Sequence, residues 1–257
     1  MKPYLTHEHP LRFAHRGSRL LWPQNTIEAF QGATDLGYIH MESDVHLTAD
    51  GVVVLFHDDV LDELTNGTGK VSEWRLEDLK LLDAAYRFKP EEDHPRRGKG
   101  VAIPTLEEAT TSFPDALWNI DMKVAAVVAP LAVEVERLGL HDRLLAASFH
   151  GDRIKRFRRL TGGQVATSAG PLEITQAWAR GRLGRTPRDE ADAYQVPRSR
   201  VLDARFVAAA HAGGKQVHVW TVDSAAEMNR LLDEGVDGIM TDRPDILNDV
   251  LAARGQP

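Results

Sequence analysis

The amino-acid sequence predicts an α/β protein built as a single TIM (β/α)8 barrel. Eight short apolar runs, each typical of a buried parallel strand, alternate with amphipathic stretches that are typical of helices. The chain has 257 residues, which is the usual size for eight strand–helix units. A doubly wound sheet is the alternative fold, but no GxGxxG or GxxxxGK[ST] motif follows any of the runs. The barrel is therefore the preferred architecture.

The first strand–helix unit begins at Phe13. The following helix starts at Ile27, because Asn25 or Thr26 can cap it, and Gly37 ends it. A second strand is expected at about 38–45. The turn of residues 48–51, TADG, then leads into a short additional strand at 52–56.

The alternation resumes after residue 104. Further main strands are expected around Trp118, Ala146, Val165, Tyr194, Val217 and Gly238. Helices are expected at 105–113, 127–138, 152–160, 172–183, 203–212 and 225–234. With the strands at Phe13 and Met41, the main strands number eight.

Residues 58–104 fit the alternation least well. A short helix is expected within 74–84, but the stretch that follows is charged and rich in proline and glycine. Long irregular segments in compact domains often form lids or binding loops, although a solvated surface excursion is the simpler possibility. We expect one domain over residues 1–257, with 58–104 as an insertion after the second strand region and as a lid.

Composition limits the classes of function. An apolar fraction of 42% and a charged fraction of 27% are those of an ordinary globular protein. A formal charge of −7 argues against a broad nucleic-acid footprint, although a local basic pocket is compatible with it. The absence of cysteine excludes disulfides and thiolate chemistry. Without a signal-peptide core or a run of transmembrane length, we expect a cytoplasmic protein with no integral membrane segment. Its oligomeric state is left open.

Polar residues recur at the ends of the predicted strands, where a TIM barrel carries its active site. They are His15, Arg16, Glu42, Asp44, His57, Asp58, Asp121, Lys123, Ser148, His218, Trp220 and Asp242. Glu42 and Asp44 lie two apart on one strand, as do Asp121 and Lys123, so each pair projects to one face. These side chains are expected to ring one mouth of the barrel.

An ordered set of motifs runs from about Phe13 to Asp245. It reads HRG, PQNT, ExD, TADG, HD, IPTLEE, DMK, SF, HVWTVD and DGIMTDRPD. As a set it resembles the signature of the glycerophosphodiester phosphodiesterase family. The resemblance implies a TIM barrel with an insertion after HD, a divalent calcium or magnesium ion, and hydrolysis of glycerophosphodiesters to sn-glycerol 3-phosphate and an alcohol.

Two positions depart from that family pattern. Glutamate is common where this chain has Gln24, which bears on a contact around the site. The third acidic ligand is often glutamate and would here be Asp121, one methylene shorter, which bears on the choice and tightness of the metal.

The chemistry of the residues agrees with the resemblance. Glu42, Asp44 and Asp121 offer only oxygen donors, which suit calcium or magnesium better than zinc. Arg16 and Lys123 suit a phosphate. His15 and His57 can exchange protons near neutral pH, and the sequence does not say which is the acid and which the base.

Alternative interpretations stay open. Asp121 and Lys123 could be only a buried ion pair, and Trp220 could be a core aromatic or a wall against the substrate. A lysophospholipase D acting on lysophospholipids would need an apolar groove beside the mouth, supplied by residues 58–104. A non-catalytic binding barrel would be expected to have lost a histidine or a carboxylate, and this chain has kept them.

Overall fold

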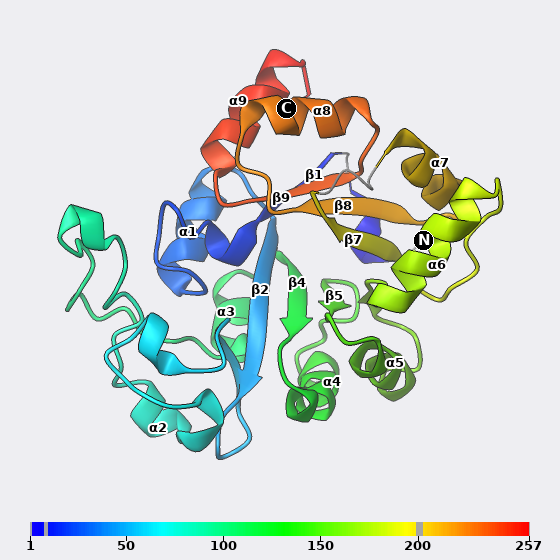
Figure 1. Ribbon diagram of the computed structural model, residues 1–257. Helices are drawn as coiled ribbons and strands as arrows, with labels where there is room; N and C mark the ends of the chain where they lie inside the picture. Colours follow the sequence, from blue (N-terminus) through cyan, green and yellow to red (C-terminus); the bar gives the residue numbers. More distant parts are fainter. Residues whose placement is uncertain (1, 8–9, 199–202, 257) are drawn as a thin grey trace.

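The computed structural model describes residues 2–7, 10–198 and 203–256, and shows a barrel of parallel strands surrounded by helices (Figure 1). The parallel strands are β1 (Leu11–Ala14), β2 (His40–Leu47), β4 (Leu117–Met122), β5 (Leu144–Ala147), β6 (Ala166–Thr167), β7 (Ala193–Pro197), β8 (Gln216–Trp220) and β9 (Gly238–Thr241). The additional strand β3 (Val53–Leu55) pairs antiparallel with β2. The predicted TIM barrel is confirmed.

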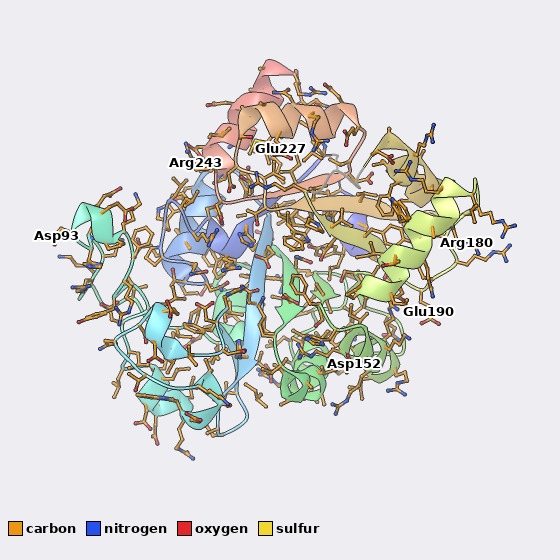
Figure 2. The ribbon with its side chains drawn as sticks, viewed as in Figure 1. Asp93, Asp152, Arg180, Glu190, Glu227 and Arg243 are labelled. Atoms are coloured by element: carbon orange, nitrogen blue, oxygen red, sulfur yellow. The ribbon has the colours of Figure 1, made fainter. Side chains whose placement is uncertain are left out.

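Nine α-helices occur in the described part of the chain. They are α1 (Ile27–Asp35), α2 (Leu76–Leu79), α3 (Leu106–Ser112), α4 (Val128–Arg137), α5 (Gly151–Leu160), α6 (Pro171–Arg182), α7 (Ala204–Ala212), α8 (Ala225–Asp233) and α9 (Pro244–Ala253). Short 3-10 turns lie at Pro3–Leu5, His15–Gly17, Leu61–Glu63, Val71–Glu73, Pro90–Glu92 and Ala125–Val127. Charged side chains such as Asp93 and Arg180 lie at the periphery of the molecule (Figure 2).

The short helix expected within 74–84 is confirmed as the single turn α2, in which Leu79 is buried, and Leu81 after it is 81% exposed. One helix differs from the sequence-based expectation. Helix α9 was not predicted. It starts with Pro244 at a position that tolerates proline, and Leu247, Val250 and Leu251 form its buried stripe.

The strands follow the order β6-β5-β4-β2-β1-β9-β8-β7 around the barrel. Strand β1 therefore lies between β2 and β9, and its residue Leu11 is paired with Gly238. The ring closes between β6 and β7, where the described residues form one isolated parallel bridge, from Ser168 to Ala193. Few ladder hydrogen bonds hold the sheet together at this seam.

The amino-terminal end of the barrel is filled by side chains. Tyr4 and Leu5 are buried there against Leu11 and Phe13. The Nζ of Lys2 donates hydrogen bonds to the carbonyl of Val165 (2.6 Å) and to Asp192 (2.9 Å). With this end closed by apolar packing, polar side chains have access to the interior from the carboxyl ends of the strands.

Residues 58–104 form a packed insertion beside the barrel. Leu61, Val71, Leu79 and Ile103 make a small core with residues of β3 and its end. An ion pair between Arg96 and Glu28 connects the insertion to α1. These contacts show where the insertion rests, and its role as a lid stays a prediction. None of the helices in the described residues is long and apolar enough to span a bilayer.

Candidate active site

All eight residues predicted to act at the site line one pocket of about 530 Å³ at the carboxyl ends of the strands. They are His15, Arg16, Glu42, Asp44, His57, Asp121, Lys123 and Trp220. Among the residues that line this pocket, none comes from the 58–104 insertion. The eight side chains therefore meet at one mouth of the barrel, and the apolar groove that a lysophospholipase D would need from the insertion is not part of the pocket wall.

The HRG motif forms a 3-10 turn at the end of β1. Gly17 has a φ of 71°, and a Cβ there would lie 2.6 Å from the Cβ of Ala29, so only glycine fits without strain. The turn directs the backbone N–H of Arg16 to the Oε2 of Glu42, at 2.9 Å. The position of Arg16 is thus set by backbone contacts before its side chain meets a ligand.

His15 is buried and held by Asp242. Its Nδ1 lies 2.8 Å from the Oδ1 of Asp242, whose Oδ2 accepts a hydrogen bond of 2.6 Å from the Nε of Arg19. Burial acts to lower the pKa of His15, but Glu42 and Asp242 outweigh it, so the pKa is raised. With Nδ1 on the carboxylate, Nε2 is the nitrogen available to a ligand, and it lies 3.9 Å from Glu42.

His57 has a similar arrangement at the end of the β3 region. Its Nδ1 lies 2.6 Å from the Oδ1 of Asp58. The hydrogen bond to His57 holds the pKa of Asp58 below its usual value, although partial burial opposes the shift. Each of the two histidines therefore has an aspartate on Nδ1, an arrangement that fixes the ring and leaves Nε2 for proton transfer.

The three carboxylates lie side by side on two strands. The pairing of β2 with β4 places Asp44 opposite Asp121. The Nζ of Lys123 lies 2.9 Å from the Oδ1 of Asp44 and 2.8 Å from the Oδ2 of Asp121. Asp44 also contacts the Nε of Arg16 at 3.3 Å. Asp44 therefore contacts both cationic side chains, Arg16 and Lys123.

Charge compensation differs among these carboxylates. Burial alone would raise the pKa of Asp44, but Lys123 and Arg16 lower it. Burial and the charge of Asp44 raise the pKa of Glu42. Burial also raises the pKa of Asp121 more than Lys123 lowers it. Glu42 and Asp121 are therefore the two groups at which additional positive charge would be most favourable.

The donor set fits a hard cation by chemistry. Glu42, Asp44 and Asp121 supply only oxygens, as calcium and magnesium prefer. Within the described residues, the Oδ1 of Asp121 is buried without a hydrogen-bond partner, although buried carboxylate oxygens are normally satisfied. No three His, Cys, Asp or Glu side chains of the described ranges are arranged as a ready metal site, and Lys123 contacts both aspartates.

The two residues that depart from the family pattern, Gln24 and Asp121, both contact a cation of the site. Gln24 accepts a hydrogen bond of 2.8 Å from the Nη1 of Arg16 through its amide oxygen, so the contact to Arg16 is made without a charge. Asp121 shares the ammonium group of Lys123 with Asp44. The shorter side chain is therefore bridged to its neighbour by an ammonium group.

Several residues of the site escaped the sequence analysis. Asp242 was expected only as one of the polar residues at the mouth, and the structure shows that it holds His15. Gln195 donates a hydrogen bond of 2.8 Å to the Oδ1 of Asn119, and both line the pocket. Asn119 lies two residues before Asp121 and could have been found by the same alternation, whereas no motif marks Gln195. His218, also expected at the mouth, is fully buried, contacts Gln216 at 3.0 Å and is not among the residues that line the pocket.

One wall of the pocket is aromatic. Trp220 and Phe149 meet edge to face, with 5.4 Å between ring centroids. The Nζ of Lys123 lies 5.7 Å from the centroid of Phe149. Trp220 thus borders the pocket instead of filling the core, which favours the wall over the core interpretation.

Comparison with known proteins identifies the family. The model of the glycerophosphoryl diester phosphodiesterase family matches residues 15–246. The chain is 39% identical to a probable glycerophosphodiester phosphodiesterase 2 of Mycobacterium tuberculosis, over 98% of this chain and 95% of that protein. It is 30% identical to a glycerophosphodiester phosphodiesterase of Caldanaerobacter subterraneus, over 95% of this chain and 99% of that one.

Solved structures agree with these matches. An Oleispira antarctica phosphodiesterase in complex with the product sn-glycerol-3-phosphate is 26% identical, with a TM-score of 0.79, over 95% of this chain and 97% of that chain. A glycerophosphodiester phosphodiesterase of Agrobacterium tumefaciens shares the fold, with 24% identity and a TM-score of 0.79, over 94% and 98% of the two chains. The family and the enzyme class predicted from the motifs are confirmed: this chain belongs to the glycerophosphoryl diester phosphodiesterase family.

Proposed function

We propose that the chain hydrolyses glycerophosphodiesters to sn-glycerol 3-phosphate and an alcohol, with a calcium or magnesium ion and with His15 and His57 as general acid and base. One observation carries the proposal: two aspartate-held histidines, three carboxylates and the cations beside them line the same pocket. A phosphodiester needs this combination, because its cleavage requires charge neutralisation together with proton transfer at two oxygens.

Electrostatics favours a metal in this pocket. The pocket contains three carboxylates, and only Arg16 and Lys123 offset their negative charge. The third cation of the pocket, Arg19, is already paired with Asp242. An excess of negative charge would repel the phosphodiester anion, and a divalent cation would reverse it. When bound, the ion would supply neutralisation of a non-bridging phosphate oxygen. It would be held by Glu42, Asp44 and Asp121.

The two cationic side chains have different tasks. Arg16 offers a planar fork of N–H donors, which suits two phosphate oxygens at once. Lys123 offers a compact positive charge next to Asp44 and Asp121. Together they orient the phosphate so that the diester bond faces the two histidines.

We further propose that the glycerol 2-hydroxyl is the first nucleophile. One histidine takes the hydroxyl proton as the new oxygen–phosphorus bond forms, and the other gives a proton to the alcohol oxygen as its bond to phosphorus breaks. Water then opens the resulting cyclic phosphate, with the two histidines in reversed roles. We expect phosphorus NMR of early time points to show a cyclic glycerophosphate. Direct formation of glycerol 3-phosphate at every time sampled would contradict this route.

Removal of the metal is expected to lower the release of glycerol 3-phosphate from glycerophosphocholine by at least about 100-fold, because several kcal/mol of charge stabilisation are lost. Calcium or magnesium added in excess over the chelator should restore it. Product release is measured with a coupled glycerol 3-phosphate assay. A rate that does not change after exhaustive chelation would refute the metal dependence while leaving the phosphodiesterase reaction standing.

Metal binding can also be measured without turnover. Saturating calcium or magnesium should raise the Tm of the wild-type protein by about 5 °C, as expected for a ligand that binds only the folded state. The variant Glu42→Gln/Asp121→Asn should lose this shift. The matched variant Glu107→Gln/Asp115→Asn, changed at exposed carboxylates away from the pocket, should keep it.

A further inference from the structure

Charge is distributed very unevenly along this chain. Residues 151–188 contain nine Lys or Arg and two Asp or Glu, a formal charge of +7, so the rest of the chain carries −14 to reach the total of −7. The stretch comprises α5, α6 and the loops that flank them, which are adjacent in the barrel (Figure 1). We call the surface formed by residues 149–188 the basic face.

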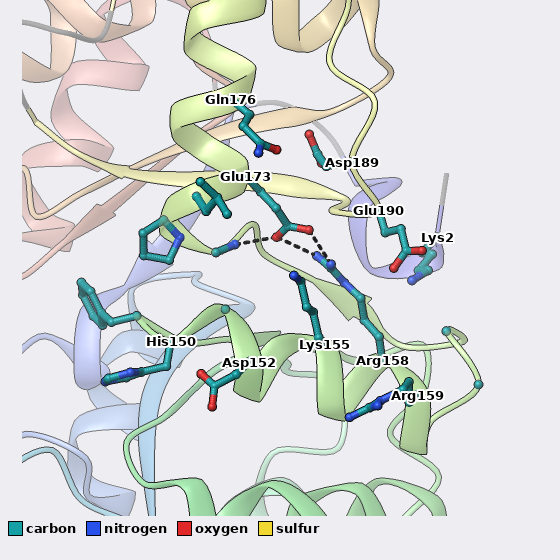
Figure 3. A pocket seen from close by; sticks show the side chains of 17 residues that line it. Lys2, His150, Asp152, Lys155, Arg158, Arg159, Glu173, Gln176, Asp189 and Glu190 are labelled. Carbon is teal, nitrogen blue, oxygen red and sulfur yellow. Dashed lines mark hydrogen bonds and ion pairs between the residues drawn. The ribbon is translucent and has the colours of Figure 1, made fainter.

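A long groove runs along the basic face between α5 and α6 (Figure 3). It has a volume of about 1360 Å³. Arg158 lies at its base, where it is 7% exposed and donates hydrogen bonds to Glu173 and Thr167. This buried pair is structural, because each charge is satisfied by the other.

Other cations of the basic face remain available. Lys155 and Arg159 of α5 line the groove, and Lys155 points toward α6 (Figure 3); neither has an ion-pair partner in the part of the chain that the structure describes. At the far end of α6, Arg180, Arg185 and Arg188 line a separate hollow of about 420 Å³. Its other two lining residues are Gly184 and Thr186, so no carboxylate opposes these arginines there.

Apart from Glu173, which is paired with Arg158, the carboxylates of the groove lie away from Lys155 and Arg159. Asp152 is in the first turn of α5, Glu190 lies near Lys2, and Asp189 lies on the side of Gln176 (Figure 3). Asp189 accepts a hydrogen bond from the hydroxyl of Tyr194. The middle of the groove therefore presents Lys155 and Arg159 as its uncompensated charges.

Exposed apolar side chains accompany these cations. Phe149, Leu160, Leu172 and Leu183 are each more than half exposed to solvent. They are placed before α5, at its end, at the start of α6 and just after α6. Bulky apolar groups interspersed with Lys and Arg are typical of surfaces that lie in the interface of a lipid bilayer.

The basic face adjoins the catalytic pocket. Phe149 and Pro171 line both the groove and the pocket that contains the two histidines. Contact between this face and another surface would therefore bring the mouth of the barrel to the edge of that surface.

We propose that the basic face docks on a bilayer of anionic phospholipids, with Lys155, Arg159, Arg180, Arg185 and Arg188 at the headgroups and the exposed leucines at the level of the acyl chains. The cations complement the negative potential of such a leaflet. Apolar contact distinguishes this occupant from a nucleic acid, whose phosphate backbone would use the cations but not the leucines. Docking of this kind goes beyond the proposed reaction and does not depend on it.

Co-sedimentation with vesicles tests the proposal. The wild-type protein should sediment with vesicles of phosphatidylcholine mixed with phosphatidylglycerol, should remain in solution with phosphatidylcholine alone, and should be released by high salt. Lys155→Gln/Arg159→Gln should lower the partition coefficient by about 30-fold, since each cation near an anionic leaflet contributes about fivefold. Lys155→Glu/Arg159→Glu should lower it further.

One control variant and one apolar variant distinguish docking by the basic face from a general effect of surface charge. Arg87→Gln/Lys99→Gln removes one exposed arginine and one exposed lysine of the insertion and should not change vesicle binding. Leu160→Ser/Leu172→Ser should weaken vesicle binding. The same variant should be retained on a heparin column as strongly as the wild type, because heparin is a polyanion that binds the cations and not the leucines. Hydrolysis of soluble glycerophosphocholine should be the same in all these variants, because none of the residues lines the catalytic pocket.

Three results would overturn the proposal. The first is a wild-type protein that does not sediment with the anionic vesicles. The second is an equal loss of binding in the Arg87→Gln/Lys99→Gln control. The third is unchanged vesicle binding in the leucine variant, which would show a general polyanion surface of the kind that nucleic acids use.

Discussion

His15→Ala and His57→Ala are each expected to lower kcat on glycerophosphocholine by about 100-fold to 10,000-fold, the range of a positioned acid or base. Each histidine has its Nδ1 on an aspartate, at 2.8 Å for His15 and 2.6 Å for His57, so Nε2 is the nitrogen left for the substrate. Alanine removes that nitrogen while the carboxylates and cations of the pocket stay. Steady-state kinetics with glycerol 3-phosphate detection measures the loss.

A matched control is His141→Ala. His141 is paired with Glu136 at the end of α4 and does not line the catalytic pocket. Its kcat should equal that of the wild type, and all three variants should retain a cooperative thermal transition. Unchanged turnover in both His15→Ala and His57→Ala would rule out the proposed acid–base roles.

Asp242→Asn is expected to have the next largest effect, a fall in kcat of about 100-fold with little change in KM, because the ring of His15 loses its orientation and its charge partner. Asp242 is fully buried and contacts both His15 and Arg19. The side chain of Asp58, by comparison, is 29% exposed. Asp58→Asn should therefore cost less, since water can take the place of the lost acceptor.

The control for Asp242→Asn is Asp245→Asn, which removes a partly exposed carboxylate of the same segment that is paired with Arg243. We expect wild-type kinetics for it. A fall in kcat that is equal in Asp245→Asn and Asp242→Asn would indicate a general disturbance of the segment after β9. A wild-type kcat in Asp242→Asn would show that His15 needs no carboxylate.

Local pattern was sufficient to predict most of the barrel and much of the site. Side chains alternate along a strand, so the spacing of Glu42 with Asp44 and of Asp121 with Lys123 already indicated which face of β2 and β4 they share. The motif order then placed these pairs at the same mouth as His15. No long-range information was needed for any of these residues.

Contacts between distant parts of the chain could not be predicted in the same way. His15 and Asp242 are 227 residues apart, and Asn119 and Gln195 are 76 apart. Both contacts depend on how the ring closes, which no local period encodes. The clustering of exposed leucines and cations on α5 and α6 likewise becomes visible only when the two helices lie side by side.

The pairing of β1 with β9 joins two segments that leave the ribosome at very different times. A chain made from its amino terminus presents β1 before β9, so Leu11 has its partner Gly238 only after β9 has left the ribosome. Until then His15 also lacks Asp242. The candidate active site is therefore completed only after β9 has been made, and a chain that stops before β9 has the HRG motif without Asp242 beside His15.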